Sequence, residues 1–419
     1  MFNKLKGTKD YYGLDAKILN YIKEKFFAIA KSFDFEFIDT PIIEEKSLFV
    51  RSVGETSDIV TKEMYTFKDN GGRDVALRPE ATASVIRAFV ENKINNLEDS
   101  KFYYFGPMFR YERPQKGRSR QFVQGGAELI CKKSPLSNFE IIQMAYEFIK
   151  SLQINDFVLE INSLGSFESR NKYINVLKKY FEKYSDKLSE ISKQRLEKNV
   201  LRILDDKEEI QKDFVKDAPK LFEFLTEQEK NEFNELTNLL NKFNIKYSIN
   251  KNLVRGLDYY NDIVFEFVST SPALGSQSTI LAGGRYDGMI KSFEGPNLDS
   301  IGFAFGDARL IEIIKWQIDK YDELNDSLDI LIAYLNEEEK DEILKITNLL
   351  RKKYRVKLLF EKVSTKELFK KFYKFNPKYL VFKELNSKEN EIKIKTKENE
   401  VTLVLKDLKD FEKAIKKLE

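Results

Sequence analysis

Two extended runs that flank a short, highly charged loop place the strongest constraint on how this chain folds. The runs lie within residues 101–131, and the loop spans residues 110–120. In the second run, residues 122–130, successive side chains alternate between the two faces of a strand. The segment therefore predicts a long β-hairpin in an antiparallel sheet. One face of its second strand is wholly apolar: Val123, Gly125, Ala127 and Leu129.

The opposite face of this predicted strand carries the polar chemistry. Gln124 and Glu128 lie four residues apart on it. An amide and a carboxylate on one face can line a polar pocket, and the adjacent Gly125 and Gly126 let a ligand approach the backbone. A solvated strand face with incidental polar residues is the alternative, and this segment alone leaves both interpretations open.

The loop between the two runs is strongly basic. The planar guanidinium group of arginine binds phosphate oxygens bidentately, so the loop suits a polyphosphate or the acidic end of a nucleic acid. An exposed basic hairpin tip is the alternative. The chain has no GxxxxGK[ST] motif, so a bound nucleotide would be held by side chains. Five cations oppose the single acid Glu112: Arg110, Arg113, Lys116, Arg118 and Arg120.

The rest of the 419 residues divides by pattern, and this length predicts two or three domains. Near the start, Asp15 is placed to cap a helix, and a short strand is predicted at 35–39. Residues 166–250 alternate Lys and Glu with almost no glycine, which predicts an inserted helical module. After a polar stretch at 322–327, strand-like and helix-like runs alternate in a compact α/β domain. The apolar stripe of the first helix is Leu19, Ile22, Phe26 and Ile29.

Charge and cysteine content exclude several classes of protein. The 71 Lys and Arg against 68 Asp and Glu leave a net charge of +3, too small to hold the chain on DNA or a membrane. Residues 327–419 carry 23 basic and 17 acidic side chains, which indicates either a polyanionic partner or a solvated lysine surface. The single cysteine, Cys131, excludes an internal disulfide framework. No stretch resembles a signal peptide or a spanning helix, so we expect a cytoplasmic protein.

The chain contains no histidine. Ordinary composition would supply on the order of eight to ten. Ser-His-Asp catalytic triads, cysteine–histidine pairs and histidine-ligated zinc sites are therefore excluded. The chemistry must use carboxylates, arginines, tyrosines and bound metal. Biased composition and selective avoidance of histidine both remain open as explanations.

Three further segments join a charged residue to a glycine or proline at a strand end, where functional sites tend to collect. They are residues 77–82, 255–260 and 282–288. Taken alone, each is a weak signal, since a turn or packed aromatic residues would explain it.

In order along the chain, these segments resemble the histidyl-tRNA synthetases, a family of class II aminoacyl-tRNA synthetases. The similarity covers essentially the whole chain. The matching segments are 6–10 at the start, 109–124 as the second class motif, 163–165 before the insertion, 255–260 and 283–288 as the two histidine-specific motifs, and 302–310 as the third class motif.

The resemblance implies an α+β fold with an antiparallel-sheet catalytic core in two parts, 1–165 and 251–325. It also implies a helical insertion at 166–250 and a C-terminal α/β anticodon-binding domain at 326–419. Such enzymes are homodimers, and the region 37–49 would contribute to the interface.

The implied activity is ATP-dependent ligation of L-histidine to tRNA(His) through a histidyl-adenylate, with Mg2+ and with no protein metal ligands, DNA or membrane involved. The alternative is a non-catalytic regulatory subunit of histidine biosynthesis. Such paralogues generally lack the C-terminal domain and lose phosphate-binding arginines, whereas this chain retains both. A pure RNA-binding protein, the third interpretation, has no reason to retain Gln124, Glu128 and Tyr260.

The resemblance also implies roles for individual residues in ATP binding. Arg110 would contact the α-phosphate, with Glu112 nearby, and Arg118 and Arg309 would hold the distal phosphates. Arg255 would reach the reacting carboxylate and the α-phosphate, so Arg110 and Arg255 are the expected catalytic residues.

The amino-acid and tRNA positions follow in the same way. Arg113 and Gln115 would reach the first base pair of the tRNA acceptor stem. The ammonium group of histidine would be received by Glu80, Thr82 and Gln124. The other histidine-binding positions would be Glu128, Arg255, Tyr259, Tyr260 and Tyr286, of which Glu128, Tyr260 and Tyr286 surround the imidazole.

Three places depart from the family pattern. Val123 replaces the usual histidine before Gln124, and Ala81 replaces the usual glycine after Glu80. In the third class motif, the familiar Gly-Leu-Glu-Arg becomes Gly-Asp-Ala-Arg at 306–309. The arginine is kept while its glutamate neighbour is lost, which affects the expected ATP geometry.

Overall fold

The protein forms two compact units in a computed structural model, Met1–Lys320 and Tyr321–Glu419, each with its own sheet. No helix in the described parts of the chain is both long and apolar enough to cross a membrane. The structure describes residues 2–54, 57, 59–94, 99–114, 117–204, 206, 208–253, 259–275, 278–324, 328–384 and 387–418.

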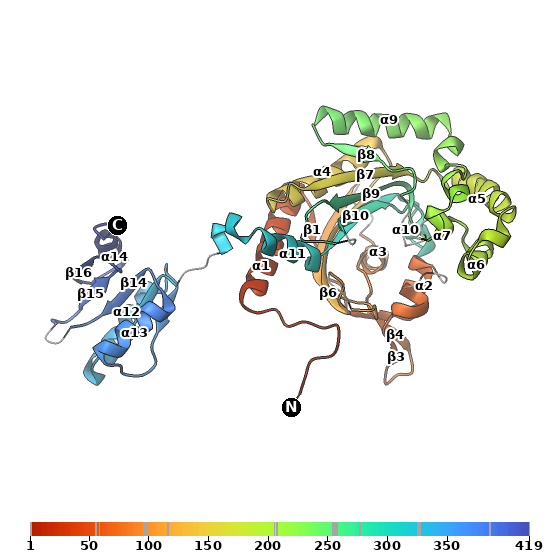
Figure 1. Ribbon diagram of the computed structural model, residues 1–419. Coiled ribbons are helices and arrows are strands. Elements are labelled where there is room, and N and C mark those ends of the chain that lie inside the picture. The colour runs from red at the N-terminus through yellow and green to blue at the C-terminus, as the bar shows by residue number, and fades with distance from the viewer. Residues whose placement is uncertain are drawn as a thin grey trace. The chain divides into compact units, whose positions relative to one another are not determined.

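An eight-stranded sheet forms the centre of the first unit (Figure 1). Its strands are antiparallel except at the two edges, where β1 runs parallel to β5 and β8 runs parallel to β7. This confirms the predicted antiparallel core. In spatial order the strands are β1 (Glu36–Phe37), β5 (Ser100–Phe109), β6 (Gln121–Ile130), β11 (Ser300–Gly306), β10 (Thr279–Arg285), β9 (Asn261–Ser269), β7 (Phe157–Ser163) and β8 (Tyr247–Ile249).

The predicted hairpin is confirmed as the β5–β6 pair. The expectation that its two glycines leave room for a ligand is wrong. A Cβ at Gly125 would lie 2.3 Å from the ring of Phe305, and one at Gly126 would lie 2.3 Å from the hydroxyl oxygen of Tyr104. The glycines therefore make room for the protein's own aromatic side chains.

Three helices cover one face of the sheet: α1 (Gly13–Ser32), α4 (Pro135–Ser151) and α11 (Asp307–Trp316) (Figure 1). Their contact with β11 is aromatic, since the Phe305 ring lies 4.9 Å from that of Phe26 and 4.5 Å from that of Phe148. These buried rings fix β11 against the helices, so its other face is free to line a site.

The first helix carries the predicted stripe but begins earlier than expected. Ile22 and Phe26 are fully buried, and Leu19 and Ile29 are half-buried. The expectation that Asp15 caps this helix is wrong, because Tyr12 is the N-cap residue. Asp15 lies in the first turn and pairs with Lys9 and Lys315 instead.

On the opposite face, α3 (Thr82–Glu91) packs its buried side chains against Phe102, Tyr104 and Ile130 of the hairpin. Thr82, the first residue of α3, donates its hydroxyl to Glu128 of β6, so the N-terminus of the helix lies at the sheet. A small antiparallel sheet in the order β2 (Ile43–Glu45), β4 (Asp74–Leu77) and β3 (Thr66–Lys68) lies beside α2 (Lys46–Val53) and α3, and α10 (Met289–Ser292) also contacts α3.

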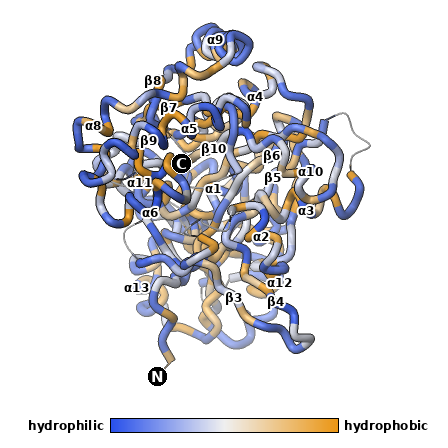
Figure 2. Tube along the Cα trace, turned by 90° about the vertical axis from the view of Figure 1, so that its right-hand side faces the viewer, coloured by the Kyte–Doolittle hydropathy of each residue, from blue (hydrophilic) through white to orange (hydrophobic). Residues whose placement is uncertain are grey.

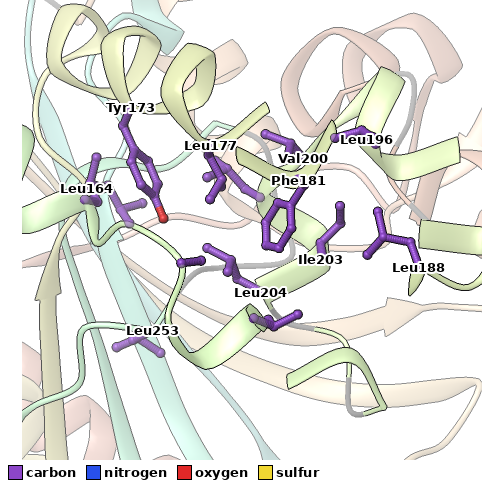
Figure 3. Close-up of a cluster of buried hydrophobic side chains, with 14 of the residues drawn as sticks. Leu164, Tyr173, Leu177, Phe181, Leu188, Leu196, Val200, Ile203, Leu204 and Leu253 are labelled. Atoms are coloured by element: carbon purple, nitrogen blue, oxygen red, sulfur yellow. The ribbon is translucent and has the colours of Figure 1, made fainter. Parts of the chain in front are cut away.

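Residues 166–250 are mainly helical, as predicted, and end in the edge strand β8. Their helices gather apolar side chains into a cluster that includes Tyr173, Leu177 and Phe181 and extends to Val264 of β9 (Figure 3). Along α9, hydrophilic and hydrophobic stretches alternate in Figure 2. We call this segment the helical module. Its helices are α5 (Phe167–Glu182), α6 (Glu190–Lys198), α7 (Leu201–Leu204), α8 (Asp213–Lys216) and α9 (Glu227–Lys242).

The second unit is the predicted α/β domain, with apolar clusters built from its sheet and helices. Its five strands have the order β13-β12-β14-β15-β16, parallel among the first three and antiparallel after that. The elements are β12 (Ile330–Ile332), α12 (Lys340–Leu350), β13 (Val356–Leu358), α13 (Thr365–Phe375), β14 (Tyr379–Phe382), β15 (Glu391–Lys395), β16 (Glu400–Val404) and α14 (Leu408–Ile415).

Candidate active site

One cavity of about 690 Å³ in the first unit brings together most of the predicted site residues. They come from segments far apart in the sequence, which the sheet and α3 assemble. One end of the cavity is rich in carboxylates and tyrosines, and the other is rich in arginines. The predicted residues that line it are Glu80, Thr82, Arg110, Glu112, Arg118, Gln124, Glu128, Tyr259, Tyr260, Tyr286 and Arg309.

Glu128 is the centre of the first end, and its side chain is 1% exposed. Thr82 donates its hydroxyl to Oε1 at 2.7 Å, and Tyr286 donates its hydroxyl to Oε2 at 2.6 Å. Burial raises the pKa of Glu128 to about 8, although these two hydrogen bonds act to lower it. The site thus holds a carboxyl group that gains or loses a proton near neutral pH.

The strand register explains why Glu128 occupies this place. Glu128 lies opposite Phe102 on β5 and opposite Gly302 on β11. A Cβ at Gly302 would lie 1.8 Å from Oε2 of Glu128. Glycine at position 302 is therefore required for the carboxylate to reach the cavity.

Glu80 is fixed at the start of α3. Its carboxylate accepts the backbone N–H groups of Thr82 at 2.7 Å and of Ala83 at 2.9 Å, at the end of the helix where a negative charge is favoured. Burial nevertheless raises the pKa of Glu80. The amide oxygen of Gln124 accepts the neighbouring N–H of Ala81 at 3.2 Å, so the departure at position 81 keeps a backbone contact with the site.

Three tyrosines form the wall beside Glu128. The Tyr259 ring lies 4.6 Å from that of Tyr260 and 5.7 Å from that of Tyr286. Burial raises the pKa of Tyr259 and of Tyr286 well above the ordinary value, so both hydroxyls stay protonated and can donate hydrogen bonds. This end can therefore enclose a flat polar ring.

Arg309 lies at the other end. Its guanidinium donates to the carbonyl oxygen of Thr279. Burial lowers the pKa of Arg309, and the like charge of Arg118 lowers it further, while Glu112 and Glu266 oppose these effects. Arg118 itself pairs with Glu112 at 3.1 Å. Arg118 and Arg309 therefore place two guanidinium groups at this end of the cavity, and this arrangement suits a polyanion.

Arg110 is held between the two ends by the backbone and by an aromatic ring. Its Nε donates to the carbonyl oxygen of Pro79 at 2.8 Å, and its guanidinium carbon lies 5.3 Å from the centre of the Phe122 ring. A side chain held from two directions keeps its charge at a defined point of the cavity.

Two acids that the sequence analysis did not assign also line the cavity. Asp307 accepts the N–H of Val123 at 3.0 Å and the hydroxyl of Tyr11 at 2.5 Å, so two of the departures from the family pattern contact each other. Glu266 lies on β9 between Phe265 and Phe267, and an acid inside an apolar strand was the signal that would have found it.

Three predicted residues are not brought into this site. Arg113 is exposed and does not line the cavity. Arg255 and Gln115 lie outside the described residues. Among the residues that the structure describes, no group of three or more acidic or thiol side chains is placed to hold a metal ion on its own.

Comparison with known proteins gives one consistent family. The family model described as histidyl-tRNA synthetase matches residues 7–310. The histidine–tRNA ligase of Mycoplasmopsis pulmonis is 45% identical over 404 residues, covering 96% of this chain and 95% of that protein. The enzyme of the same name from Mycoplasma mobile is 51% identical over 315 residues, covering 75% and 71%. The structure of apo S. aureus histidyl-tRNA synthetase superimposes with a TM-score of 0.82 at 30% identity, covering 98% and 99%.

Proposed function

The chain belongs to the histidyl-tRNA synthetase family of class II aminoacyl-tRNA synthetases, and from this premise we propose how its cavity ligates histidine to tRNA(His). Histidine and ATP bind side by side, and an oxygen of the histidine carboxylate attacks the α-phosphorus. Pyrophosphate leaves, and a hydroxyl of the tRNA 3′ end then attacks the carbonyl carbon of the adenylate, so that the acyl–phosphate bond breaks and AMP leaves. Positioning and charge neutralisation supply most of the catalysis in such a displacement, so no histidine side chain is needed.

The carboxylate end of the cavity is the proposed histidine pocket. Glu128 and Tyr286 face the imidazole with Tyr260, and the ring of Tyr259 closes the wall. An imidazole has polar atoms at both sides, so another amino acid would leave buried groups here without partners, which disfavours its binding. The ammonium group of histidine is received by Glu80, Thr82 and Gln124.

The arginine end is the proposed ATP site. Arg110 contacts the α-phosphate, and Arg118 and Arg309 contact the distal phosphates. Arg255 is proposed for the reacting carboxylate by the family resemblance alone. Glu112 completes this group and pairs with Arg118.

Mg2+ is the proposed companion of ATP. The ion is usually held by one or two carboxylates together with the substrate phosphates, so it needs no preformed cluster of acids. Glu112 and Glu266 line the arginine end and fit this requirement. When bound, the ion neutralises phosphate charge.

The remaining assignments concern the assembly. We propose a cytoplasmic homodimer whose interface includes the region 37–49, where Phe37, Ile42 and Ile43 are exposed. The segments 1–165 and 251–325 act as the catalytic core, 166–250 as the insertion and 326–419 as the anticodon-binding domain. Arg113 and Gln115 contact the acceptor stem.

The observation that carries the proposal is that one cavity holds both the buried Glu128 group and the cluster around Arg309. A regulatory subunit of histidine biosynthesis is not favoured, since relatives over nearly the full length are named histidine–tRNA ligases.

Histidine-dependent exchange between ATP and pyrophosphate, followed by charging of tRNA(His), tests the proposal. Arg110→Ala is expected to lower exchange by about 100-fold or more, because it removes a charge aimed at the reacting phosphate. Arg113→Ala is the matched variant three residues away, and it should lower charging about tenfold while exchange stays nearly unchanged. The proposed ligase function would be refuted if the wild-type protein showed no ATP–pyrophosphate exchange, or if its exchange did not depend on histidine.

A further inference from the structure

Tyr260 belongs both to the cavity and to the core of the helical module. It lines the cavity, is 7% exposed and packs in the apolar cluster that contains Tyr173 and Leu177. Tyr259 packs against this cluster and also against the one that contains Tyr286. The tyrosine wall is therefore shared between the module and the catalytic sheet.

A charged side chain of the module also holds this wall. Arg170, in the first turn of α5, donates from Nη1 to the carbonyl oxygen of Tyr260 at 2.7 Å. The two residues are 90 positions apart in the sequence. Hydrogen bonds with an ionised donor are stronger and better oriented than neutral ones. The bond fixes the backbone from which the Tyr260 ring projects.

The first turn of α5 is itself firmly held. Ser166 caps the helix by accepting the N–H of Ser169. Glu229 of α9 accepts the N–H of Ser166 at 2.6 Å and the hydroxyl of Ser169 at 2.8 Å. Arg170 therefore projects from a rigid base, and its position is set by the module.

Two cavities border the wall, so packing does not cover all of its surface. A second cavity of about 570 Å³ is also lined by Tyr259 and Tyr260, together with Arg170. Close packing is available on the sheet side, where a Cβ at Gly284 would lie 3.0 Å from the Tyr260 ring. Packing alone therefore fixes only part of the position of the Tyr260 ring.

We propose that Arg170 is a positioning residue for histidine binding, through which the helical module sets the position of Tyr260 in the histidine pocket. The inference rests on the proposed function, in which Tyr260 faces the imidazole. Arg170 contacts neither substrate. Its removal moves the wall beside the imidazole and leaves the arginine end in place.

Steady-state exchange kinetics with Arg170→Gln test this role. The histidine KM is expected to rise about tenfold, while kcat and the ATP KM stay near the wild-type values. Arg170→Lys keeps a charged donor and should restore part of the affinity. Lys172→Ala is the control on the same helix, since Lys172 pairs with Glu168 on the exposed surface, and it should leave the histidine KM unchanged.

A double-mutant cycle with Tyr260→Phe separates positioning from general loosening. If Arg170 acts through Tyr260, its substitution should raise the histidine KM much less when the Tyr260 hydroxyl is already absent. Additive effects, an unchanged histidine KM or an equal rise in the ATP KM would each overturn the inference. A wild-type protein without histidine-dependent exchange would instead refute the proposed function.

Discussion

The proposed histidine pocket and the helical module each bury a glutamate, and the pKa values of the two carboxylates shift in opposite directions. Burial raises the pKa of Glu128 to about 8, and the hydrogen bonds from Tyr286 and Thr82 only partly offset it. Burial also acts to raise the pKa of Glu229, but the backbone N–H groups of Ser166 and Thr226 lower it to about 2. The difference lies in burial and in the donors, since Glu128 is the more deeply buried and accepts from two hydroxyls, whereas Glu229 accepts from backbone amides as well as a hydroxyl.

This contrast separates a binding group from a structural one. Glu229 joins two helix starts, because it accepts from the caps of both α5 and α9. The carboxylate oxygens of Glu229 thus accept hydrogen bonds from the protein itself. Among the residues that the structure describes, no backbone N–H donates to the buried Glu128, and a further donor would favour its ionised form. A ligand with an N–H group, such as imidazole, supplies one.

The largest expected effect is a pH dependence of stability that comes from Glu128 alone. Its pKa is about 8 in the folded protein and ordinarily 4.5, so folding favours the protonated form. Below pH 4.5 it has no effect, and as pH rises toward 8 its ionisation increasingly opposes folding. Glu128→Gln should therefore gain stability over wild type, by up to about 4 kcal/mol between pH 5 and pH 8.

Urea unfolding of both proteins at several pH values measures this difference. The pH dependence of stability has the opposite sign for Glu229. Its ionised carboxylate contributes its full stabilisation of the fold above pH 4.5, and this stabilisation is lost as pH falls toward 2. A constant stability difference between wild type and Glu128→Gln would remove the contrast between the two carboxylates.

The second effect is on the module. Glu229→Ala leaves the N–H groups of Ser166 and Thr226 and the hydroxyl of Ser169 without their acceptor. We expect a loss of about 3 kcal/mol in the free energy of unfolding, because each buried donor without a partner costs about 1 kcal/mol or more. Denaturant titration at pH 7 measures it. Glu227→Ala, an exposed neighbour paired with Lys230, is the control and should lose far less.

The third effect is on the histidine pocket. Glu128→Ala should raise the histidine KM about 30-fold, equivalent to about 2 kcal/mol, because it removes the proposed buried partner of the imidazole. The ATP KM should stay near the wild-type value, and the protein should remain folded. Exchange kinetics with each substrate varied in turn measure both constants. An unchanged histidine KM would show that Glu128 is not the imidazole partner.

The smallest expected effect concerns a single donor to Glu229, the hydroxyl of Ser169. Ser169→Ala removes one hydroxyl from Glu229 and leaves the backbone donors in place. The expected loss of stability is about 1 kcal/mol. A loss as large as that of Glu229→Ala would mean that the hydroxyl, rather than the backbone, stabilises this carboxylate.

The polar face of the hairpin was predictable because strand periodicity is short and strict. Residues two apart share a face, so Gln124 and Glu128 could be placed together before any partner was known. The stripe of the first helix was predictable from the helical period, since residues three and four apart share a helix face. The cap at Asp15 failed because a polar residue near a helix start does not settle which residue is the N-cap.

Contacts between distant segments were not predictable from a local pattern. The bond from Tyr11 to Asp307 joins residues 296 positions apart, and that from Arg170 to Tyr260 joins residues 90 apart. In the sequence, nothing distinguishes Glu229 from the other acidic residues of α9. Sequence polarity identifies a donor or an acceptor, but the partner depends on the packing of whole elements.

The order in which a ribosome makes the chain gives the Tyr11–Asp307 bond a further meaning. The carboxylate that receives Tyr11 emerges almost 300 residues after it. At about 5–20 residues per second, the N-terminal segment waits roughly 15–60 seconds for this partner. Strand β6 waits in the same way for β11, so the backbone groups along one edge of β6 have no partner strand during this part of synthesis. A chain released before residue 300 would therefore lack both the β11 partner of β6 and the carboxylate that receives Tyr11.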